Sequence, residues 1–410
     1  MKNSILLAAV LCAPLAAQPP EPVIEWNRTV LQLLRTPGAQ PAAVHPTRTL
    51  AILHGAIYDA VNSIEKSHAP YRVFLPDVPA SASQDAAASS AAHEVLTNLL
   101  PAFQAQLDAR YQQSLSSVPD GSDKDAGIAA GKTVADQLLA IRAGDGSRNA
   151  PPPFVFGSGP GAYQSTPPNF PSPQFTIWSQ VTPFALASAN QFRPGPPPDL
   201  SSAVYVDALN EISALGIAHS ATATAEQKFI GVFWNGAIQD YWNEIAQAVA
   251  SSQQLATPQA ARLFALLNIA VADTVIAFYD AKYVYNFWRP VTAIRATADP
   301  NWLPEVKTTA ADPSYPGAHG AISAAAANVL AFFFGSDQFA FIIRSEVFAG
   351  TERSFSSFSS ASEEAFLSRI YAGQHFRFDQ QAGGQLGASV ADFVTTNLLG
   401  ANPNPPGANQ

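Results

Sequence analysis

The segment ARLFALLNIAVADTVIAFYDAKYVYNFWRP, residues 261–290, carries the longest helical pattern of the chain. Its apolar residues recur at intervals of three and four positions, which predicts a helix with a broad buried face. Residues 48–64, 85–100 and 126–144 show the same periodicity. All four segments are rich in alanine, which favours helix and close helix packing. Strand signals are sparse, so we predict an all-α fold.

Residues 144–200 break this pattern, because they are rich in Gly, Pro and Ser and also carry aromatic residues. A loop of this length with aromatic side chains is expected to wrap over a helical body rather than to form a free linker. Helical segments flank it on both sides. We therefore predict one helical domain over residues 18–400, with two halves and a wrapping loop, followed by a disordered tail at 401–410.

The first 17 residues have the pattern of a secretory signal peptide. A basic residue, Lys2, precedes an apolar run, and the small residues Ala16 and Ala17 precede a polar, proline-rich stretch. This order predicts cleavage after Ala17 and a secreted or periplasmic protein. The chain's one cysteine, Cys12, lies inside this segment. The mature protein is therefore expected to have neither a disulfide nor thiolate chemistry.

The overall composition excludes several classes of partner. The chain has 22 Lys+Arg against 31 Asp+Glu, a net charge of -9, and has no basic tract of the kind that follows a phosphate backbone. This argues against nucleic acid as a partner. Residues 261–279 come closest to a membrane span, but Arg262, Asn268 and Asp273 interrupt them. We therefore expect no membrane span.

Two cations stand near the end of the long helical segment. Lys282 and Arg289 are seven residues apart, a spacing that brings both to nearly the same face of a continuous helix. They can then bind one anion. The alternative is structural, because cations in a last turn complement the helix dipole and a proline such as Pro290 commonly follows.

Two downstream stretches carry further candidates. In DPSYPGAHG, residues 312–320, His319 follows a turn at Pro316 and Gly317 and precedes a helical stretch. A helix start offers free backbone N–H groups and a positive dipole end, and both suit an anion.

The second stretch is SRIYAGQHFRFD, residues 368–379. His375 and Asp379 are four apart, so Asp379 can hold one imidazole nitrogen and fix the tautomer. Arg369 does not share their face on a continuous helix. A break at Gly373 would let it point back at the same site.

Each candidate also has a plain structural interpretation as a core histidine, a cap, an i,i+4 pair or a surface cation. Together they spell KxxxxxxRP, a histidine after a proline turn, and SRxxxxxHxxxD, which is a specific combination. Guanidinium groups bind tetrahedral oxyanions through paired hydrogen bonds. A histidine tied to a carboxylate can attack or coordinate the central atom, and a second histidine can move a proton. The set therefore predicts a phosphate or vanadate site.

These motifs resemble those of the vanadium-dependent haloperoxidases and the related acid phosphatases of the type 2 phosphatidic acid phosphatase superfamily. The stretches at 49–65, 225–236, 261–295 and 372–383 are most similar to the bacterial haloperoxidase-like branch. The resemblance implies a largely helical fold built around two four-helix bundles. It also implies that vanadate is the cofactor, with Lys282, Arg289 and Arg369 on its equatorial oxygens and His375 on the vanadium.

The resemblance further implies a peroxidase activity. Hydrogen peroxide would displace vanadate oxygens, Lys282 would polarise the bound peroxide, and a halide or small organic substrate would be oxidised while vanadium stays in its oxidised state. His319 would be the acid/base group and Asp379 would orient His375. Homodimers also occur in the family.

Two positions depart from the family pattern. Where the family usually has Ser-Gly-His, this chain has Gly317, Ala318 and His319, so a hydroxyl donor is missing while the backbone N–H groups of Gly317 and Ala318 are expected to bind the oxyanion. Losing one donor to a developing oxyanion costs about 3 kcal/mol in barrier. Asp312 stands where an aromatic or histidine is usual, and its carboxylate is expected to repel a halide.

Three alternatives stay open from the sequence. In a phosphatase, His375 would form a phosphohistidine and His319 would protonate the leaving alcohol. The change at Gly317 and Ala318 could also leave an oxyanion-binding protein with little catalysis. The last alternative is a non-haem iron site of His319, His375 and Asp379, which ranks lowest because three nearby cations would oppose a divalent metal.

Overall fold

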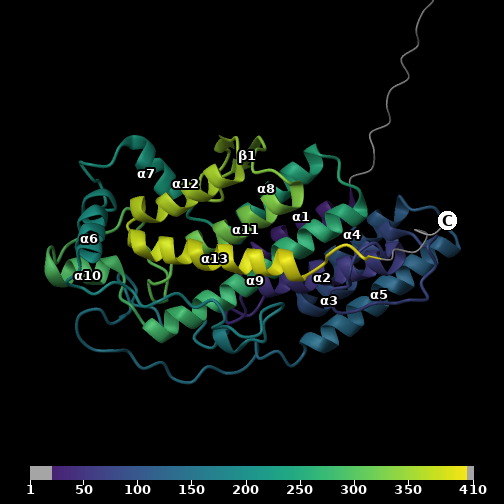
Figure 1. Cartoon of the computed structure of the whole chain (residues 1–410), viewed down its shortest axis with the longest axis horizontal. Helices are drawn as coiled ribbons and strands as arrows, with labels where there is room; N and C mark the ends of the chain where they lie inside the picture. The colour runs from purple at the N-terminus through teal and green to yellow at the C-terminus, as the bar shows by residue number, and fades with distance from the viewer. Residues whose placement is uncertain (1–20, 404–410) are drawn as a thin grey trace, which may run out of the picture.

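The computed structural model describes residues 21–403 and consists mainly of α-helices (Figure 1). The predicted all-α class is confirmed. In this part of the chain the strands are β1 (Phe341–Arg344) and β2 (Glu352–Phe355), which pair antiparallel as one small hairpin. The predicted signal peptide, with Cys12, lies outside the described residues, as do residues 404–410.

The helices begin and end close to the segments that the apolar periodicity predicts. In chain order they are α1 (Pro22–Leu34), α2 (Pro46–Glu65), α3 (Gln84–Leu99), α4 (Gln104–Ser116), α5 (Ser122–Arg142), α6 (Ala203–Leu215), α7 (Ala225–Phe233), α8 (Ile238–Ser252), α9 (Thr257–Tyr285), α10 (Pro290–Thr297), α11 (Ala318–Phe334), α12 (Phe358–Tyr371) and α13 (Arg377–Asn397). Two short 3-10 helices, η1 (Pro101–Phe103) and η2 (Trp178–Gln180), lie in the connections.

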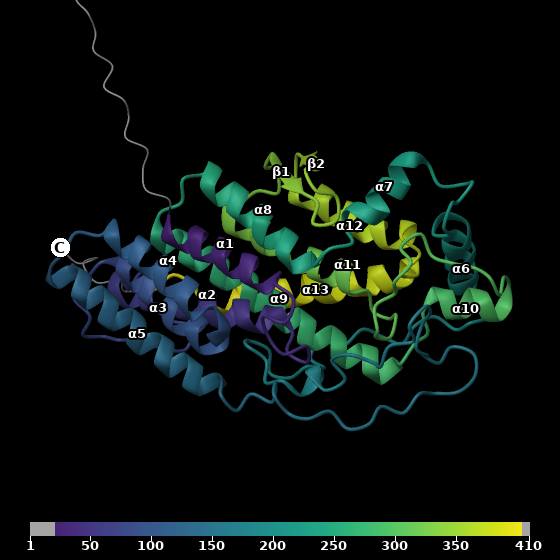
Figure 2. The same ribbon diagram turned by 180° about the vertical axis from the view of Figure 1, so that it is seen from behind.

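Helix α9 is the centre of the fold and belongs to both halves. On one side it packs with α2, which in turn packs on α3 and α5; on the other it packs with α11 and α13, flanked by α8 and α12 (Figures 1 and 2). Almost every side chain of α9 is buried, because bundles cover it from both sides. The two predicted helical halves therefore share this one helix.

The segment between α5 and α6 runs along the outside of the helices (Figure 2). Its side chains Trp178 and Phe184 are buried in the main core. Asp273 of α9 fixes the loop, because its carboxylate accepts hydrogen bonds of 2.6–2.8 Å from the backbone N–H groups of Phe184, Ala185 and Leu186. The loop wraps over the helical body, as its composition predicts.

Helix α9 is long and apolar enough to cross a membrane, but 94% of its most apolar window is buried inside the protein. Its apolar residues thus form the core of the two bundles. At the chain end, Ala401 pairs with His68, and the Asn402 N–H donates to the carbonyl of Ser67 at 2.8 Å. These contacts correct the start of the predicted tail, since residues 401 and 402 are held against the fold.

Candidate oxyanion site

Lys282 and Arg289 meet, but not on one helix face. Helix α9 ends at Tyr285, Asn286 takes a left-handed conformation with φ 50°, and Arg289 is the N-cap of α10. Pro290 is therefore the first residue of a new helix rather than the stop of the old one, which is a position that proline favours. The predicted shared face is wrong, and the two cations instead converge across the break between α9 and α10.

Lys282 is fully buried and points at the stretch before α11. Its Nζ donates to the carbonyls of Pro313 and Ser314 and lies 3.8 Å from a carboxylate oxygen of Asp312. These acceptors are not in the last turn of α9, so Lys282 does not cap its own helix. Burial lowers the Lys282 pKa to about 8, although Asp312 acts in the opposite direction.

Arg289 connects the residues of the site, since it bonds to Asp312, Gln374 and His375. Its Nε donates to the Asp312 carbonyl at 2.8 Å, and its Nη2 pairs with the Asp312 carboxylate. Its Nη1 donates to the Gln374 carbonyl at 3.1 Å and to His375 Nε2 at 2.9 Å. Since a guanidinium only donates, His375 Nε2 is an acceptor here and the ring proton sits on Nδ1.

That Nδ1 proton is directed at Asp379, whose Oδ2 lies 3.2 Å away. The two residues do not lie on one helical face, although the spacing predicts this. His375 precedes α13, and Asp379 reaches back to it from the first turn of that helix. Asp379 Oδ2 also accepts from the Phe376 N–H at 3.0 Å and from Ser314 Oγ at 2.5 Å. The carboxylate thus fixes the helix start and the imidazole together.

Burial shifts both members of this pair. It raises the Asp379 pKa to about 7, with Ser314 and Lys282 opposing the shift. It lowers the His375 pKa well below 6.5, and the nearby charges of Arg289 and Lys282 lower it further. His375 is therefore neutral at physiological pH, so its Nε2 is unprotonated and can bind an electrophile that displaces the hydrogen bond from Arg289.

Arg369 lies in the same cluster because the chain turns sharply after α12. Helix α12 ends at Tyr371, and Gly373 follows with φ +75°. A Cβ at position 373 would come within 3.0 Å of the Gly216 carbonyl, so this turn requires glycine. Arg369 Nη1 donates to Asn235 Oδ1 at 3.0 Å, while its buried Nε has no partner. The predicted break at Gly373 is present.

The charge of Arg369 is itself perturbed by the site. Burial lowers its pKa to about 9, and the proximity of Arg289 contributes in the same direction. Two guanidinium groups that repel one another in a buried position form a site that favours an anion.

His319 is the second residue of α11 and is half-buried. Its Nε2 lies 2.9 Å from the Trp234 carbonyl, so Nε2 carries the proton and Nδ1 has the free lone pair. Burial lowers the His319 pKa well below 6.5, with Arg369 and Arg289 acting in the same direction. A neutral imidazole with one free acceptor nitrogen can take a proton.

One of the two backbone N–H groups predicted to bind the oxyanion already has an acceptor within the protein. The Gly317 N–H donates to the carbonyl of Asp379 at 2.7 Å, so it is not available to an oxyanion as expected from the sequence. The Ala318 N–H lies at the first position of α11 and has no helical acceptor. The backbone therefore offers one donor here rather than two.

The structure adds residues that the motifs do not mark as site residues. They are Asn235 on Arg369, Ser314 on Asp379, and Gln374 on Arg289. Ser314 lies inside the 312–320 stretch and Gln374 beside His375, so their place in the motifs is the signal that could have found them. Asn235 is remote in sequence, and only the packing of α7 against α12 brings it close.

The iron alternative is not supported. Within residues 21–403 no group of three His, Cys, Asp or Glu side chains has the geometry to hold a metal ion. His319 faces Trp234, whereas His375 and Asp379 bind one another. The described residues therefore contradict this lowest-ranked alternative, because His319 has a different partner from the pair of His375 and Asp379.

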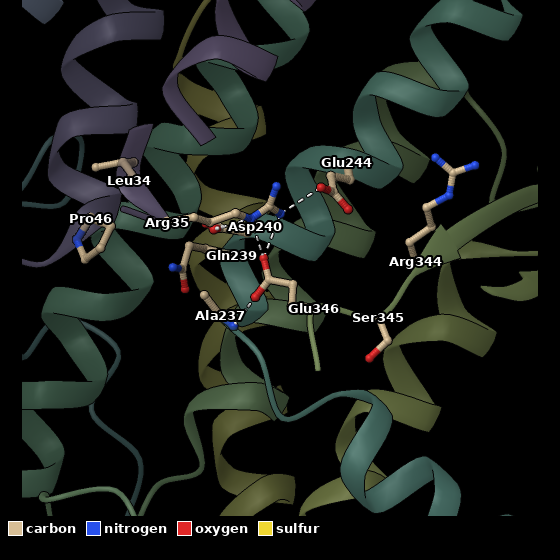
Figure 3. A pocket seen from close by; sticks show the side chains of 10 residues that line it. All are labelled: Leu34, Arg35, Pro46, Ala237, Gln239, Asp240, Glu244, Arg344, Ser345 and Glu346. Carbon is tan, nitrogen blue, oxygen red and sulfur yellow. Dashed lines mark hydrogen bonds and ion pairs between the residues drawn. The ribbon is translucent and has the colours of Figure 1, made fainter. Parts of the chain in front are cut away.

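A polar hollow lies away from this cluster, between α1, α8 and the hairpin (Figure 3). Arg35 lies there 2.7 Å from Glu244, 2.7 Å from Glu346 and 3.6 Å from Asp240. Burial raises the Asp240 pKa to about 8, and Glu346 adds to the rise. Glu244 and Glu346 both pair with the one arginine and leave no positive charge for an anion, so this hollow is an ion-pair site rather than an oxyanion site.

Known proteins are similar to this chain in sequence and in fold. A family model described as the VCPO second helical-bundle domain matches residues 262–400, the range that holds every predicted site residue. The vanadium chloroperoxidase of Curvularia inaequalis is 26% identical over 390 residues, which take in 74% of this chain and 64% of that protein. The chain thus spans less than two thirds of that relative's length.

Solved structures extend the likeness to the whole fold. The first bacterial vanadium-dependent iodoperoxidase is 26% identical with a TM-score of 0.80, over 93% of this chain and 97% of its own. A holo-type bacterial vanadium-dependent chloroperoxidase has a TM-score of 0.68 over 89% of this chain and 94% of its own; at 16% identity it shows the fold alone. The resemblance predicted from the sequence is confirmed: the chain is similar in sequence and in fold to vanadium-dependent haloperoxidases.

Proposed function

We propose that this protein is a haloperoxidase-like enzyme that uses bound vanadate to activate hydrogen peroxide and to oxidise a halide or small organic substrate. The observation that carries the proposal is the convergence of Lys282, Arg289 and Arg369 on a neutral His375. The 26% identity to an iodoperoxidase over almost the whole chain supports it.

The residues present fit a tetrahedral oxyanion. Arg369 Nε and Gln380 Nε2 are buried donors without an acceptor, and unpaired buried donors of this kind cost free energy unless a ligand binds them. Lys282, Arg289 and Arg369 bring three positive charges, and Asp312 offsets only part of them. Bound vanadate would supply a Lewis-acidic centre on which hydrogen peroxide is activated.

The protein's own groups have distinct tasks in this proposal. His375 offers the Nε2 lone pair, which accepts from Arg289 in the free protein and would exchange that hydrogen bond for the ligand. Asp379 holds the proton on Nδ1 and so keeps Nε2 unprotonated. Lys282 presents N–H donors from a buried position. His319, with a free Nδ1, takes and returns a proton beside the oxyanion.

Asp312 is paired with two cations of the site, which the sequence alone does not predict. Its carboxylate binds Arg289 and lies close to Lys282, so an entering oxyanion competes with Asp312 for the same cations. The repulsion of a halide expected from the sequence is weakened by these two partners, because a paired carboxylate presents less net negative charge.

The test begins with calorimetric titration of the mature protein with orthovanadate. The same sample is then assayed for peroxide-dependent oxidation of iodide and bromide, and for hydrolysis of a phosphate ester without peroxide. Vanadate binding with peroxide-dependent oxidation is the expected result. Ester hydrolysis alone would select the phosphatase, and binding without either activity would identify an oxyanion-binding protein.

Variants show whether the binding uses the proposed cations. Lys282→Ala and Arg289→Ala are each expected to weaken vanadate and phosphate binding about tenfold or more, since each removes a charged donor. Arg344→Ala is the control, because Arg344 is exposed and pairs with Glu352 in the hairpin, away from the cluster. If vanadate and phosphate affinity were unchanged in both Ala variants, the role of Lys282 and Arg289 would be structural.

Export is part of the proposal and rests on the first 17 residues alone. Sequencing the N-terminus of the secreted protein tests it, with a start at Gln18 expected. A homodimer, as in other members of the family, is tested by light scattering on that same sample.

A further inference from the structure

The side chain of Gln380 fills the space beside Gly317. Gln380 is fully buried in the first turn of α13, directly after Asp379. Gly317 is the N-cap of α11, and its N–H donates to the Asp379 carbonyl at 2.7 Å. Gly317 is therefore hydrogen-bonded to Asp379, the residue that orients His375, and Gln380 is its neighbour in the chain.

The orientation of the Gln380 amide follows from its one hydrogen bond. The Gly320 N–H donates to Oε1 at 2.7 Å, and only an oxygen can accept there. The nitrogen Nε2 must therefore point the other way, toward Gly317. Nε2 is buried and has no acceptor in the protein.

A side chain at position 317 would displace the Gln380 amide. A Cβ built on Gly317 would come within 3.0 Å of the Nε2, Cδ and Oε1 atoms of Gln380, with Nε2 the nearest. Real Cβ atoms do not make contacts this close, so a serine at 317 requires the end of the Gln380 side chain to shift from its position at the Gly320 N–H. The Gln380 amide nitrogen thus occupies the space that a side chain at position 317 would take.

We propose that Gln380 Nε2 is the hydrogen-bond donor that replaces the missing hydroxyl at position 317 and binds the oxyanion held by Arg289, Arg369 and His375. The inference rests on the proposed oxyanion site and adds to it a binding residue. An apolar side chain such as methionine would fill the same space without leaving a donor unpaired, whereas an amide is stabilised there only when a ligand accepts from it.

The first experiment compares Gln380→Met with the wild type by titration with orthovanadate and with inorganic phosphate. Methionine has a similar volume but no donor, so we expect binding of both anions to weaken about tenfold or more. Gln381→Met is the matched control, because Gln381 is the adjacent residue and is exposed. Thermal unfolding of each variant without ligand shows that it is folded.

A second pair of variants asks whether a hydroxyl and the amide are interchangeable. Gly317→Ser alone is expected to lower the melting temperature, because the new side chain collides with Gln380. Combined with Gln380→Ala, the same serine gains space and supplies a hydroxyl donor. We expect the double variant to bind orthovanadate more tightly than Gln380→Ala alone, by about tenfold.

A spectroscopic readout is independent of activity. In protein labelled with ¹⁵N-glutamine, the side-chain amide signal that Gln380→Met lacks belongs to Gln380, and it should shift when orthovanadate is added. Binding that is equal in wild type and Gln380→Met, with an unmoved amide signal, would overturn the role of Gln380 and leave the oxyanion site intact. Wild-type protein that binds neither anion would overturn the proposed function itself.

Discussion

At the scale of single residues, Asp312 decides how open the cation cluster is to a ligand. It pairs with Arg289 and lies 3.8 Å from Lys282, so the free protein carries its own counter-ion. Asp312→Asn removes that charge and keeps the shape. We expect the free energy of unfolding of the ligand-free variant to fall by about 3 kcal/mol, because buried cations lose their partner.

The same variant should bind orthovanadate more tightly, by about tenfold or more, since the anion no longer competes with a carboxylate. Calorimetry at pH 6.5, where Lys282 is protonated, measures this directly. Asp77→Asn is the control, because Asp77 is exposed. Weaker vanadate binding by Asp312→Asn would show that the carboxylate positions the cations rather than competing for them.

Lys282 predicts a pH dependence of binding. Burial lowers its pKa to about 8 in the free protein, so the positive charge is present at pH 7 and is lost as pH rises through about 8. Vanadate affinity should therefore fall between pH 7 and pH 9. Lys282→Arg keeps its charge over this range, and titrations of both proteins at each pH separate the lysine from the ionisation of vanadate itself.

An affinity that falls equally in wild type and Lys282→Arg would assign the pH dependence to another group. Asp379 is the first to consider, because its pKa is raised to about 7 and its ionisation adds negative charge behind His375. The two proteins would then need comparison with Asp379→Asn.

At the scale of elements, the wrapping loop depends on one carboxylate of α9. Asp273 is buried, and three successive backbone N–H groups of the loop donate to it. Asp273→Ala leaves these donors unpaired, so we expect the free energy of unfolding to fall by about 3 kcal/mol. Limited proteolysis should show faster cleavage between α5 and α6.

Phe184→Leu is the comparison for that experiment, because it reduces packing of the same loop but keeps the three hydrogen bonds. Equal protease resistance of Asp273→Ala and wild type would mean that apolar burial alone holds the loop.

The elements also show what the sequence can predict. Period and composition predict α2, α3, α5 and α9 to within a few residues, since each is a long amphipathic or buried helix. The spacing of Lys282 and Arg289 predicts one continuous helix, yet the helix ends at Tyr285, before the left-handed Asn286, and the two cations still converge. Local periodicity cannot detect a single left-handed residue that ends a helix, nor the contact between Asn235 and Arg369, which depends on tertiary packing.

At the scale of the whole molecule, many buried acids make stability depend on pH. Burial raises the pKa of each of these acids: Glu21 and Asp379 to about 7, Asp59 and Asp273 to about 6, and Asp240 to about 8. The folded protein therefore holds protons that the unfolded chain releases above about pH 4. Where the folded state binds more protons, the free energy of unfolding falls as pH rises.

Buried histidines have the opposite effect on the free energy of unfolding, and they act over a lower pH range. Burial lowers the pKa of His45 and of His54 to about 3, and lowers those of His319 and His375 well below 6.5. Here the unfolded chain binds more protons, so this contribution to stability increases with pH and is complete above about 6.5. The two effects oppose one another below that pH. Above it the acids dominate up to about pH 8, where the loss of the Lys282 proton from the folded protein begins to oppose them.

The free energy of unfolding should consequently fall between pH 6.5 and pH 8, and Asp240 is the acid that titrates last. Asp240→Asn cannot release a proton, so its stability should fall less over that interval than that of the wild type. Denaturant unfolding at pH 6.5, 7.25 and 8 measures the difference, with Asp77→Asn as the exposed control. Parallel pH profiles of Asp240→Asn and wild type would mean that Arg35 keeps Asp240 ionised in the folded state, and that the hollow of Figure 3 is a permanent ion-pair network.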